Sequence, residues 1–178
     1  SVNYKSSLIE AYFKELKPKY KVTFIKENTP LGTAGVLNKL KKQFDQPVFV
    51  SNSDIIVETD FLDIYNYHKK HKNKITVVAS AKNYEIPYGV CKIDKNGNLN
   101  NITEKPRFNF LVNTGLYIIN PEILKSIPKN KKFDMTDLIK KVKLSKKKIG
   151  VYPVDEDSWI DIGQWNEYKL AVNKLNNY

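Results

Sequence analysis

The stretch Pro47-Val48-Phe49-Val50-Ser51-Asn52-Ser53-Asp54 decides the fold class, because it is an apolar strand-like run that ends in a carboxylate. A second run, Trp159-Ile160-Asp161-Ile162-Gly163, has the same form far along the chain. In α/β proteins, ligands bind at the open edge of the sheet, beyond the ends of the strands. Two carboxylates placed there could share a hard cation that gathers phosphate oxygens. The two runs therefore indicate phosphate chemistry, with Asp54 and Asp161 as metal ligands.

Helix-like and strand-like segments alternate on both sides of the first run. Apolar spacing predicts helices at 7–16, 34–44, 60–71, 121–127, 134–143 and 164–175, with Thr59 or Asp60 capping the third and Asp134 the fifth. Strands are expected at 21–25, 47–51, 74–79, 110–120 and 150–154, and a hairpin at 88–103 about the turn 94–97. The order predicts one α/β domain over residues 1–178, a three-layer α/β/α sandwich with a mostly parallel mixed sheet.

Composition excludes several classes of protein. The 178 residues are 41% hydrophobic and 28% charged, as in an ordinary globular domain, and no apolar run is long enough to span a membrane. The net charge of +11 is compatible with nucleic-acid binding, but lysines are spread along the chain and Arg107 is the only arginine. Base-edge recognition relies on arginine, so a solvated lysine-rich surface is the favoured interpretation and no nucleic-acid partner is predicted.

Cysteine and histidine give no metal or redox motif. Cys91 is the only cysteine, which excludes an internal disulfide, and its apolar neighbours predict a place in the core. Together with the lack of a signal-like segment, this favours the cytoplasm. His68 and His71 lie among lysines, which predicts an exposed helical face.

Two loops carry candidate ligand-binding groups. Small residues in Pro30-Leu31-Gly32-Thr33-Ala34-Gly35 would let a ligand approach free backbone N–H groups at a helix start, although a simple turn is the alternative. In Glu104-Lys105-Pro106, the proline should hold Lys105 in an extended conformation that aims its ammonium at a phosphate. An exposed surface lysine is the alternative there.

Two strand-like runs place a glycine beside hydrogen-bonding side chains. They are Tyr88-Gly89-Val90 and Asn113-Thr114-Gly115-Leu116-Tyr117. Glycine within a strand often marks a close approach by a ligand, and the polar groups suit a ligand with many hydroxyls. Bulges in a sheet would explain either run equally well.

Taken in order, these motifs resemble the sugar-1-phosphate nucleotidyltransferases. The shared pattern is Glu-x-x-Pro-Leu-Gly-Thr-Ala-Gly, Asn-x-Asp, Tyr-Gly-Val, Glu-Lys-Pro, Asn-x-Gly-x-Tyr and Trp-x-Asp-Ile-Gly, and it extends over nearly the whole chain. The resemblance implies a Rossmann-like nucleotide-diphospho-sugar transferase fold. It also implies a role for each matching residue: Glu27, Leu31, Gly32 and Thr33 for the nucleotide; Tyr88, Gly89, Glu104 and Asn113 for the sugar; Lys105 for the sugar phosphate; Asp54 and Asp161 for Mg²⁺.

The implied reaction is attack by a sugar 1-phosphate on the α-phosphorus of a nucleoside triphosphate, which releases pyrophosphate. The segments at 86–90 and 110–113 favour the branch that handles mannose-, heptose- or N-acetylglucosamine-type 1-phosphates, often with GTP. A homo-oligomer is compatible with the sequence. A regulatory or ligand-sensing domain of the same fold is the alternative function.

The chain departs from the family pattern at its beginning. It has no Gly-Gly-x-Gly-Thr-Arg-Leu loop and no Pro-Lys-Pro lysine, which in the family cradle the triphosphate. The only methionine is Met135, and Ser1-Val2-Asn3-Tyr4 reads like the end of a strand. We therefore expect an N-terminally truncated fold, the sugar-binding larger part of a longer enzyme, that is inactive alone.

Overall fold

The computed structural model describes residues 1–163, 165, 168, 171 and 172, so the expected helix at 164–175 lies for the most part outside the described residues. The chain forms two compact units: unit 1 comprises 1–50, 68–76 and 118–150, and unit 2 comprises 51–67, 77–117 and 151–178. A four-stranded sheet has the strand order β1 (Val48–Ser51), β6 (Arg107–Ile119), β3 (Ile75–Glu85) and β7 (Ile149–Val154).

Unit 1 holds most of the helices. They are α1 (Ser6–Leu16), α2 (Gly32–Gly35), the 3₁₀ helix η1 (Val36–Leu40), α4 (Pro121–Leu124) and α5 (Met135–Leu144). Met135, Leu138 and Val142 repeat at helical spacing on α5 and are buried. Asp134 and Asp137 form a capping box at its start, so the expected helix and its cap are confirmed.

Two expected elements of unit 1 differ in the structure. Residues 21–25 form no strand, because the only pairing described there is an isolated parallel bridge between Val2 and Lys26. Alternation of apolar residues is not sufficient without a neighbouring strand to pair with. The helix expected at 34–44 is instead α2 followed by η1, and it ends at Leu40.

Unit 2 contains two short strands that bring distant parts of the chain together. β2 (Ile55–Val57) and β8 (Trp159–Asp161) pair antiparallel, with Ile55 opposite Asp161, and the 3₁₀ helix η2 (Glu156–Ser158) leads into β8. β2 was not predicted from the sequence. α3 (Phe61–Lys70) begins after Asp60, whose Oδ1 accepts hydrogen bonds from the backbone N–H groups of Leu62 at 2.8 Å and Asp63 at 3.2 Å.

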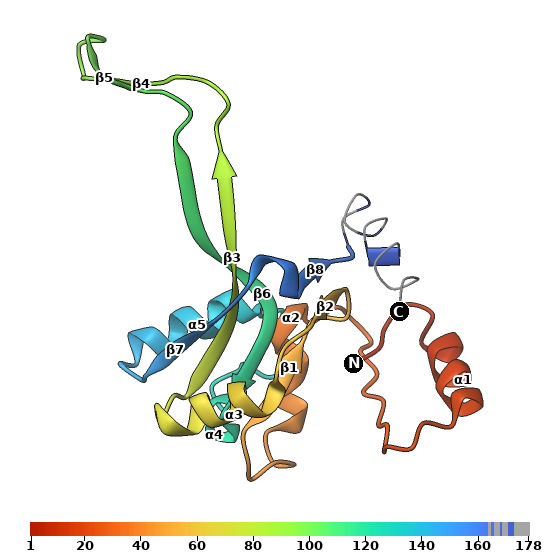
Figure 1. The fold of residues 1–178 in the computed structure, drawn as a ribbon. Coiled ribbons are helices and arrows are strands. Elements are labelled where there is room, and N and C mark those ends of the chain that lie inside the picture. The colour runs from red at the N-terminus through yellow and green to blue at the C-terminus, as the bar shows by residue number, and fades with distance from the viewer. Residues whose placement is uncertain (164, 166–167, 169–170, 173–178) are drawn as a thin grey trace. The chain divides into compact units, whose positions relative to one another are not determined.

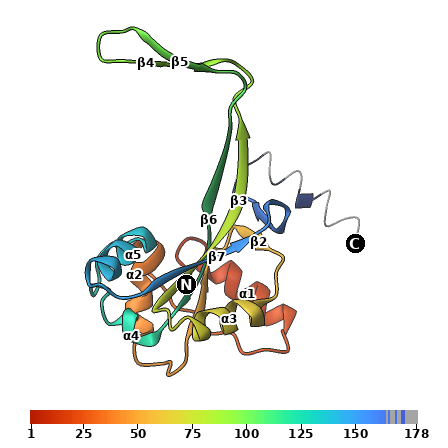
Figure 2. The same cartoon turned by 60° about the vertical axis from the view of Figure 1, so that its left-hand side comes forward.

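The expected hairpin consists of β4 (Val90–Ile93) and β5 (Leu99–Thr103), which pair antiparallel. The backbone N–H of Gly97 donates to the carbonyl of Asp94 at 3.2 Å and closes the predicted turn. Figures 1 and 2 show the chain rising through β3 into this hairpin and returning through β6. A hairpin can join only antiparallel neighbours. The α/β class and a mixed sheet are confirmed. The pairing is mostly antiparallel, as in β2 with β8 and β4 with β5, so the expected mostly parallel sheet is wrong.

Apolar residues of the hairpin form cross-strand pairs that are exposed to solvent. Cys91 faces Ile102 and Ile93 faces Leu99, and Ile93, Leu99 and Ile102 are 66%, 62% and 58% exposed. Cys91 is exposed as well, so its expected place in the core is wrong. Its apolar neighbours belong to a ribbon of two strands, on which a side chain is not enclosed by a second layer.

None of the helices in the described part of the chain is both long and apolar enough to cross a membrane.

Candidate functional site

Asp54 and Asp161 converge at Gly163 in unit 2. The pairing of β2 with β8 places Asp161 opposite the residue that follows Asp54, and the backbone N–H of Ile162 donates to the carbonyl of Asp54 at 2.9 Å. A methyl group built on Gly163 would lie 3.1 Å from Oδ1 of Asp161 and 3.1 Å from Oδ2 of Asp54. The carboxylates expected to share a cation therefore border the same small space.

The donor set at this point suits Mg²⁺. Among the described residues, no group of three or more His, Cys, Asp or Glu side chains gathers in one place, so two carboxylates are what the protein offers. Mg²⁺ is commonly bound through one or two carboxylates and completes its shell with water and substrate phosphates. Two hard oxygen ligands beside a glycine leave room for those other ligands.

Asn52 connects this region to β6. Its backbone N–H donates to the carbonyl of Gly115 at 3.0 Å. A methyl group on Gly115 would lie 2.8 Å from the side-chain nitrogen of Asn52, so β6 requires glycine here. Asn52 was not predicted as a site residue, although its place two residues before Asp54 was the available signal.

Asn113 is held in place by its own strand. Its side-chain nitrogen donates to the hydroxyl of Tyr117 at 2.6 Å, and its side-chain oxygen accepts from the backbone N–H of Gly115 at 3.2 Å. Tyr117 is only 3% exposed, and burial raises the pKa of its hydroxyl. Asn113 itself is exposed, so a positioned amide faces solvent.

The other residues expected at the sugar lie where the hairpin joins β3 and β6. A methyl group on Gly89 would lie 3.0 Å from Oε2 of Glu104, so these two residues meet. Tyr88 is exposed next to them. Among the described residues, no hydrogen bond or ion pair joins Gly89 or Glu104 to Asp54 or Asp161.

Lys105 does not have the expected extended backbone. Its φ is +44°, in the left-handed region, where a residue with a side chain is strained by about 1–2 kcal/mol. The backbone N–H of Ile86 donates to the carbonyl of Pro106 at 3.1 Å, which fixes the chain just after the lysine. This contact across the ribbon outweighs the local preference of a residue that precedes proline. Lys105 is exposed on this turn.

The residues expected at the nucleotide lie in unit 1, where the loop bonds to the start of α5. Oε2 of Glu27 accepts from the backbone N–H of Leu31 at 2.9 Å, and Oδ1 of Asp134 accepts from that of Thr33 at 3.0 Å. The backbone N–H of Ala34 donates to the carbonyl of Phe133 at 3.0 Å. These N–H groups are therefore engaged within the chain rather than free, contrary to the expectation.

Gly32 and Leu31 also have specific places in this loop. Gly32 has a φ of +75°, and a methyl group there would collide with Oδ1 of Asp134 and lie 2.9 Å from the carbonyl oxygen of Phe133. Leu31 is buried. Asp134 thus braces the loop in addition to capping α5, a role that spacing along the sequence did not indicate.

Unit 1 also has a cavity of about 670 Å³, and none of the expected site residues lines it. It is lined by Lys69, Lys72, Lys74, Glu122 and the buried His68, among others. The exposed position expected for His68 is wrong: it is 1% exposed, its Nε2 lies 2.9 Å from Oδ1 of Asn120, and its Nδ1 lies 2.8 Å from Oγ1 of Thr76. Burial lowers the pKa of His68, and the hydrogen bond to Asn120 opposes that shift.

The sequence and the fold are similar to those of known proteins. The nucleotidyl transferase family model matches residues 1–177. Mannose-1-phosphate guanyltransferase 2 of Candida glabrata is 34% identical over 94% of this chain and 48% of its own length, and mannose-1-phosphate guanyltransferase of Saccharomyces cerevisiae is 33% identical over the same shares. The chain therefore spans about half the length of these relatives.

Among solved structures, HddC of Yersinia pseudotuberculosis superimposes with a TM-score of 0.72 at 25% identity, over 97% of this chain and 76% of that one. A protein of Bacillus anthracis named as a putative glucose-1-phosphate thymidylyltransferase has the same fold, with a TM-score of 0.65 at 16% identity over 94% of this chain and 70% of that one. With a family model that matches nearly every residue and relatives more than 30% identical, this chain belongs to the nucleotidyl transferase family.

Proposed function

We propose that the protein transfers a nucleotidyl group from a nucleoside triphosphate to a sugar 1-phosphate, giving a nucleotide sugar and pyrophosphate. The observation that carries this proposal is the convergence of Asp54 and Asp161 at Gly163, in a chain that belongs to the nucleotidyl transferase family. The carboxylates would hold Mg²⁺, which would neutralise charge on the phosphate oxygens.

In this proposal the chain's own groups bind and orient the substrates. Lys105 would pair with the phosphate of the sugar, and Tyr88, Gly89, Glu104 and Asn113 would contact its hydroxyls. Glu27, Leu31, Gly32 and Thr33 would take part on the nucleotide side. An oxygen of the sugar phosphate attacks the α-phosphorus, the bond from that phosphorus to the bridging oxygen of the β-phosphate breaks, and pyrophosphate leaves.

The nucleotide is proposed to be GTP and the sugar a mannose-type 1-phosphate. Two relatives that are 34% and 33% identical are named mannose-1-phosphate guanyltransferases, which supports this choice. HddC of Yersinia pseudotuberculosis, in a structure complexed with GMP-PN, superimposes with a TM-score of 0.69. A cytoplasmic location is also proposed, since the single cysteine is an exposed thiol.

The test is pyrophosphate release from GTP and mannose 1-phosphate by the longest native form of the protein in the presence of Mg²⁺. Asp54→Asn and Asp161→Asn should each lower kcat by several decades, because metal stabilisation contributes several kcal/mol to such a transition state. Asp45→Asn, a change at an exposed carboxylate of unit 1, is the matched control and should leave the rate unchanged.

Lys105→Ala separates the two substrates. It should raise the KM for the sugar 1-phosphate and leave the KM for GTP nearly unchanged, because the lost charge faces the sugar phosphate. Nucleotide and sugar binding without turnover in the native protein would instead support the regulatory alternative.

A further inference from the structure

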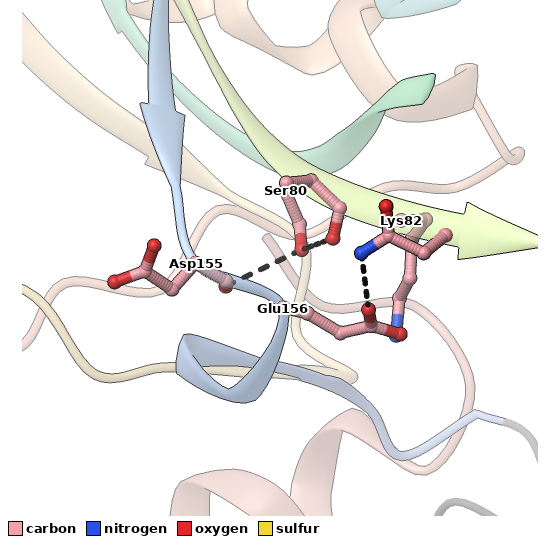
Figure 3. Close-up of polar contacts among 6 residues, drawn as sticks. Ser80, Lys82, Asp155 and Glu156 are labelled. Atoms are coloured by element: carbon pink, nitrogen blue, oxygen red, sulfur yellow. Dashed lines mark hydrogen bonds and ion pairs between the residues drawn. The ribbon is translucent and has the colours of Figure 1, made fainter. Parts of the chain in front are cut away.

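Side chains of β3 contact the turn that leads into β8, and Figure 3 shows Ser80 and Lys82 beside Asp155 and Glu156. The hydroxyl of Ser80 lies between two carbonyl acceptors, that of Ala81 at 3.3 Å and that of Asp155 at 3.4 Å. Nζ of Lys82 lies 3.2 Å from Oε1 of Glu156, and the side-chain nitrogen of Asn83 lies 3.4 Å from Oε2 of the same carboxylate. Each oxygen of the Glu156 carboxylate thus contacts a different residue of β3, and the two contacts hold the turn against this strand.

Lys82 also contacts the first residue of β8. Its Nζ lies 5.5 Å from the centre of the Trp159 ring, within the range of a cation–π interaction. The indole nitrogen of Trp159 donates to the carbonyl of Thr114 at 3.1 Å. The side chain of Lys82 is only 21% exposed, so solvent screens these contacts less than it would those of a surface lysine.

β8 needs an anchor of this kind. It has three residues and pairs with three residues of β2, and a two-stranded ladder of that size is marginal without further packing. Asp161 is the last residue of β8, and its distance from Asp54 depends on how β8 lies against β2. Displacement of the turn or of Trp159 would therefore move the Asp161 carboxylate.

We propose that Lys82, through Glu156 and Trp159, is a positioning residue for the metal ligand Asp161. This inference rests on the proposed function, because it assumes that Asp54 and Asp161 hold the metal. Lys82 itself is paired with Glu156 and touches neither Asp54 nor Asp161 in any described hydrogen bond or ion pair.

The test is binding of Mn²⁺ alone to the 178-residue chain, measured from the electron paramagnetic resonance signal of the free ion. Lys82→Met keeps most of the side-chain volume and removes the charge, and it should raise the Kd for Mn²⁺ roughly tenfold, the lower end of the effect of residues that orient metal ligands. Glu156→Gln should have a similar effect. The double variant should bind no more weakly than either single variant, because both remove the same contact.

Two lysine variants serve as controls. Lys92→Met, at an exposed lysine of β4, should leave the Kd unchanged. Lys82→Arg keeps a charge that can reach Glu156, so it should retain most of the affinity. A thermal melt of each variant shows whether it is folded, and Lys82→Arg and Glu156→Gln still decide the question if Lys82→Met does not fold.

The outcomes separate this inference from the proposed function. If Asp54→Asn leaves Mn²⁺ binding unchanged, or if the unmodified chain binds none, the metal site itself is wrong. If Asp54→Asn abolishes binding while Lys82→Met and Glu156→Gln bind as the unmodified chain does, the positioning role of Lys82 is overturned, even where their melting temperatures fall. A tenfold loss in both of those variants, with Lys92→Met unaffected, supports it.

Discussion

The side-chain nitrogen of Asn113 lies 2.6 Å from the hydroxyl of Tyr117, four residues along β6. Asn113 is exposed and Tyr117 is buried, so a hydroxyl in the core accepts a hydrogen bond from an amide that faces solvent. The tyrosine that ends the Asn-x-Gly-x-Tyr pattern thereby orients the asparagine that begins it.

Tyr117→Phe removes this orienting bond. The net loss of one hydrogen bond is about 1 kcal/mol, so the KM for the sugar 1-phosphate should rise about fivefold while the KM for GTP stays unchanged. Steady-state kinetics with each substrate varied in turn would measure this. Tyr12→Phe, at an exposed tyrosine of α1, is the control, and equal effects of the two changes on both substrates would contradict the role given to Tyr117.

Gly163→Ala should weaken metal binding without unfolding the protein. The added methyl group would lie 3.1 Å from a carboxylate oxygen of Asp54 and of Asp161, and side-chain ends at that distance can move apart. Titration with Mn²⁺ should show a higher Kd, and urea unfolding should show nearly the same stability. A variant with unaltered affinity for Mn²⁺ would mean that the ion lies elsewhere.

Gly32→Ala should destabilise the fold more than Gly97→Ala does. Both glycines have positive φ, at +75° and +86°, so each change introduces backbone strain of about 1–2 kcal/mol. Only Gly32 also has Asp134 and Phe133 within contact, whereas a methyl group on Gly97 meets nothing within 4 Å. Urea unfolding of the two variants isolates the steric part, and equal losses would show that the contact with α5 relaxes at no cost.

Stability should fall on mild acidification because of His68. Burial, with Lys69 and Lys74 nearby, lowers the pKa of His68 in the folded protein below 6.5, so the unfolded chain binds the proton more readily. The contribution of neutral His68 is complete above about pH 6.5 and is lost as the pH falls towards the folded pKa, by at most about 1.4 kcal/mol per pH unit.

The measurement is urea unfolding at several pH values above about pH 5. The hydrogen bond to Lys74 lowers the pKa of Glu122 from 4.5, so this nearby carboxyl stays ionised over that range. His68→Gln keeps a polar side chain and cannot titrate, so its unfolding free energy should vary less with pH. The same pH slope in both proteins would assign the effect to other groups.

Elements with strong local signals were predictable from the sequence. The start of α5 is specified by Asp134 and Asp137 within one turn, and the hairpin by the turn that Gly97 closes. β8 was indicated by the apolar run that ends at Asp161, but β2 carries only three residues, too few for a periodic pattern. β2 exists because it pairs with β8, about a hundred residues further along the chain.

Residues whose environment comes from distant segments were not predictable. Lysines beside His68 indicated an exposed helix face, but Asn120 and Thr76, on other elements, enclose the ring. The proline after Lys105 predicted an extended backbone, but the bond between Ile86 and Pro106 across the ribbon fixes a left-handed one. The meeting of Asp54 and Asp161 was predictable, because each residue closes an apolar run. The bracing of the Gly32 loop by Asp134 was not, because the hydrogen bond from Thr33 to Asp134 joins residues 101 positions apart in the chain.

The exposed thiol of Cys91 gives this protein a built-in attachment point for a spectroscopic reporter. It is the only cysteine in the chain, and it lies on β4 two residues beyond Gly89. A maleimide fluorophore would therefore react at one defined position next to the residues proposed to contact the sugar. Ligand titrations followed by that dye need no engineered mutation, and they would report sugar occupancy directly, in a chain that does not have to turn over.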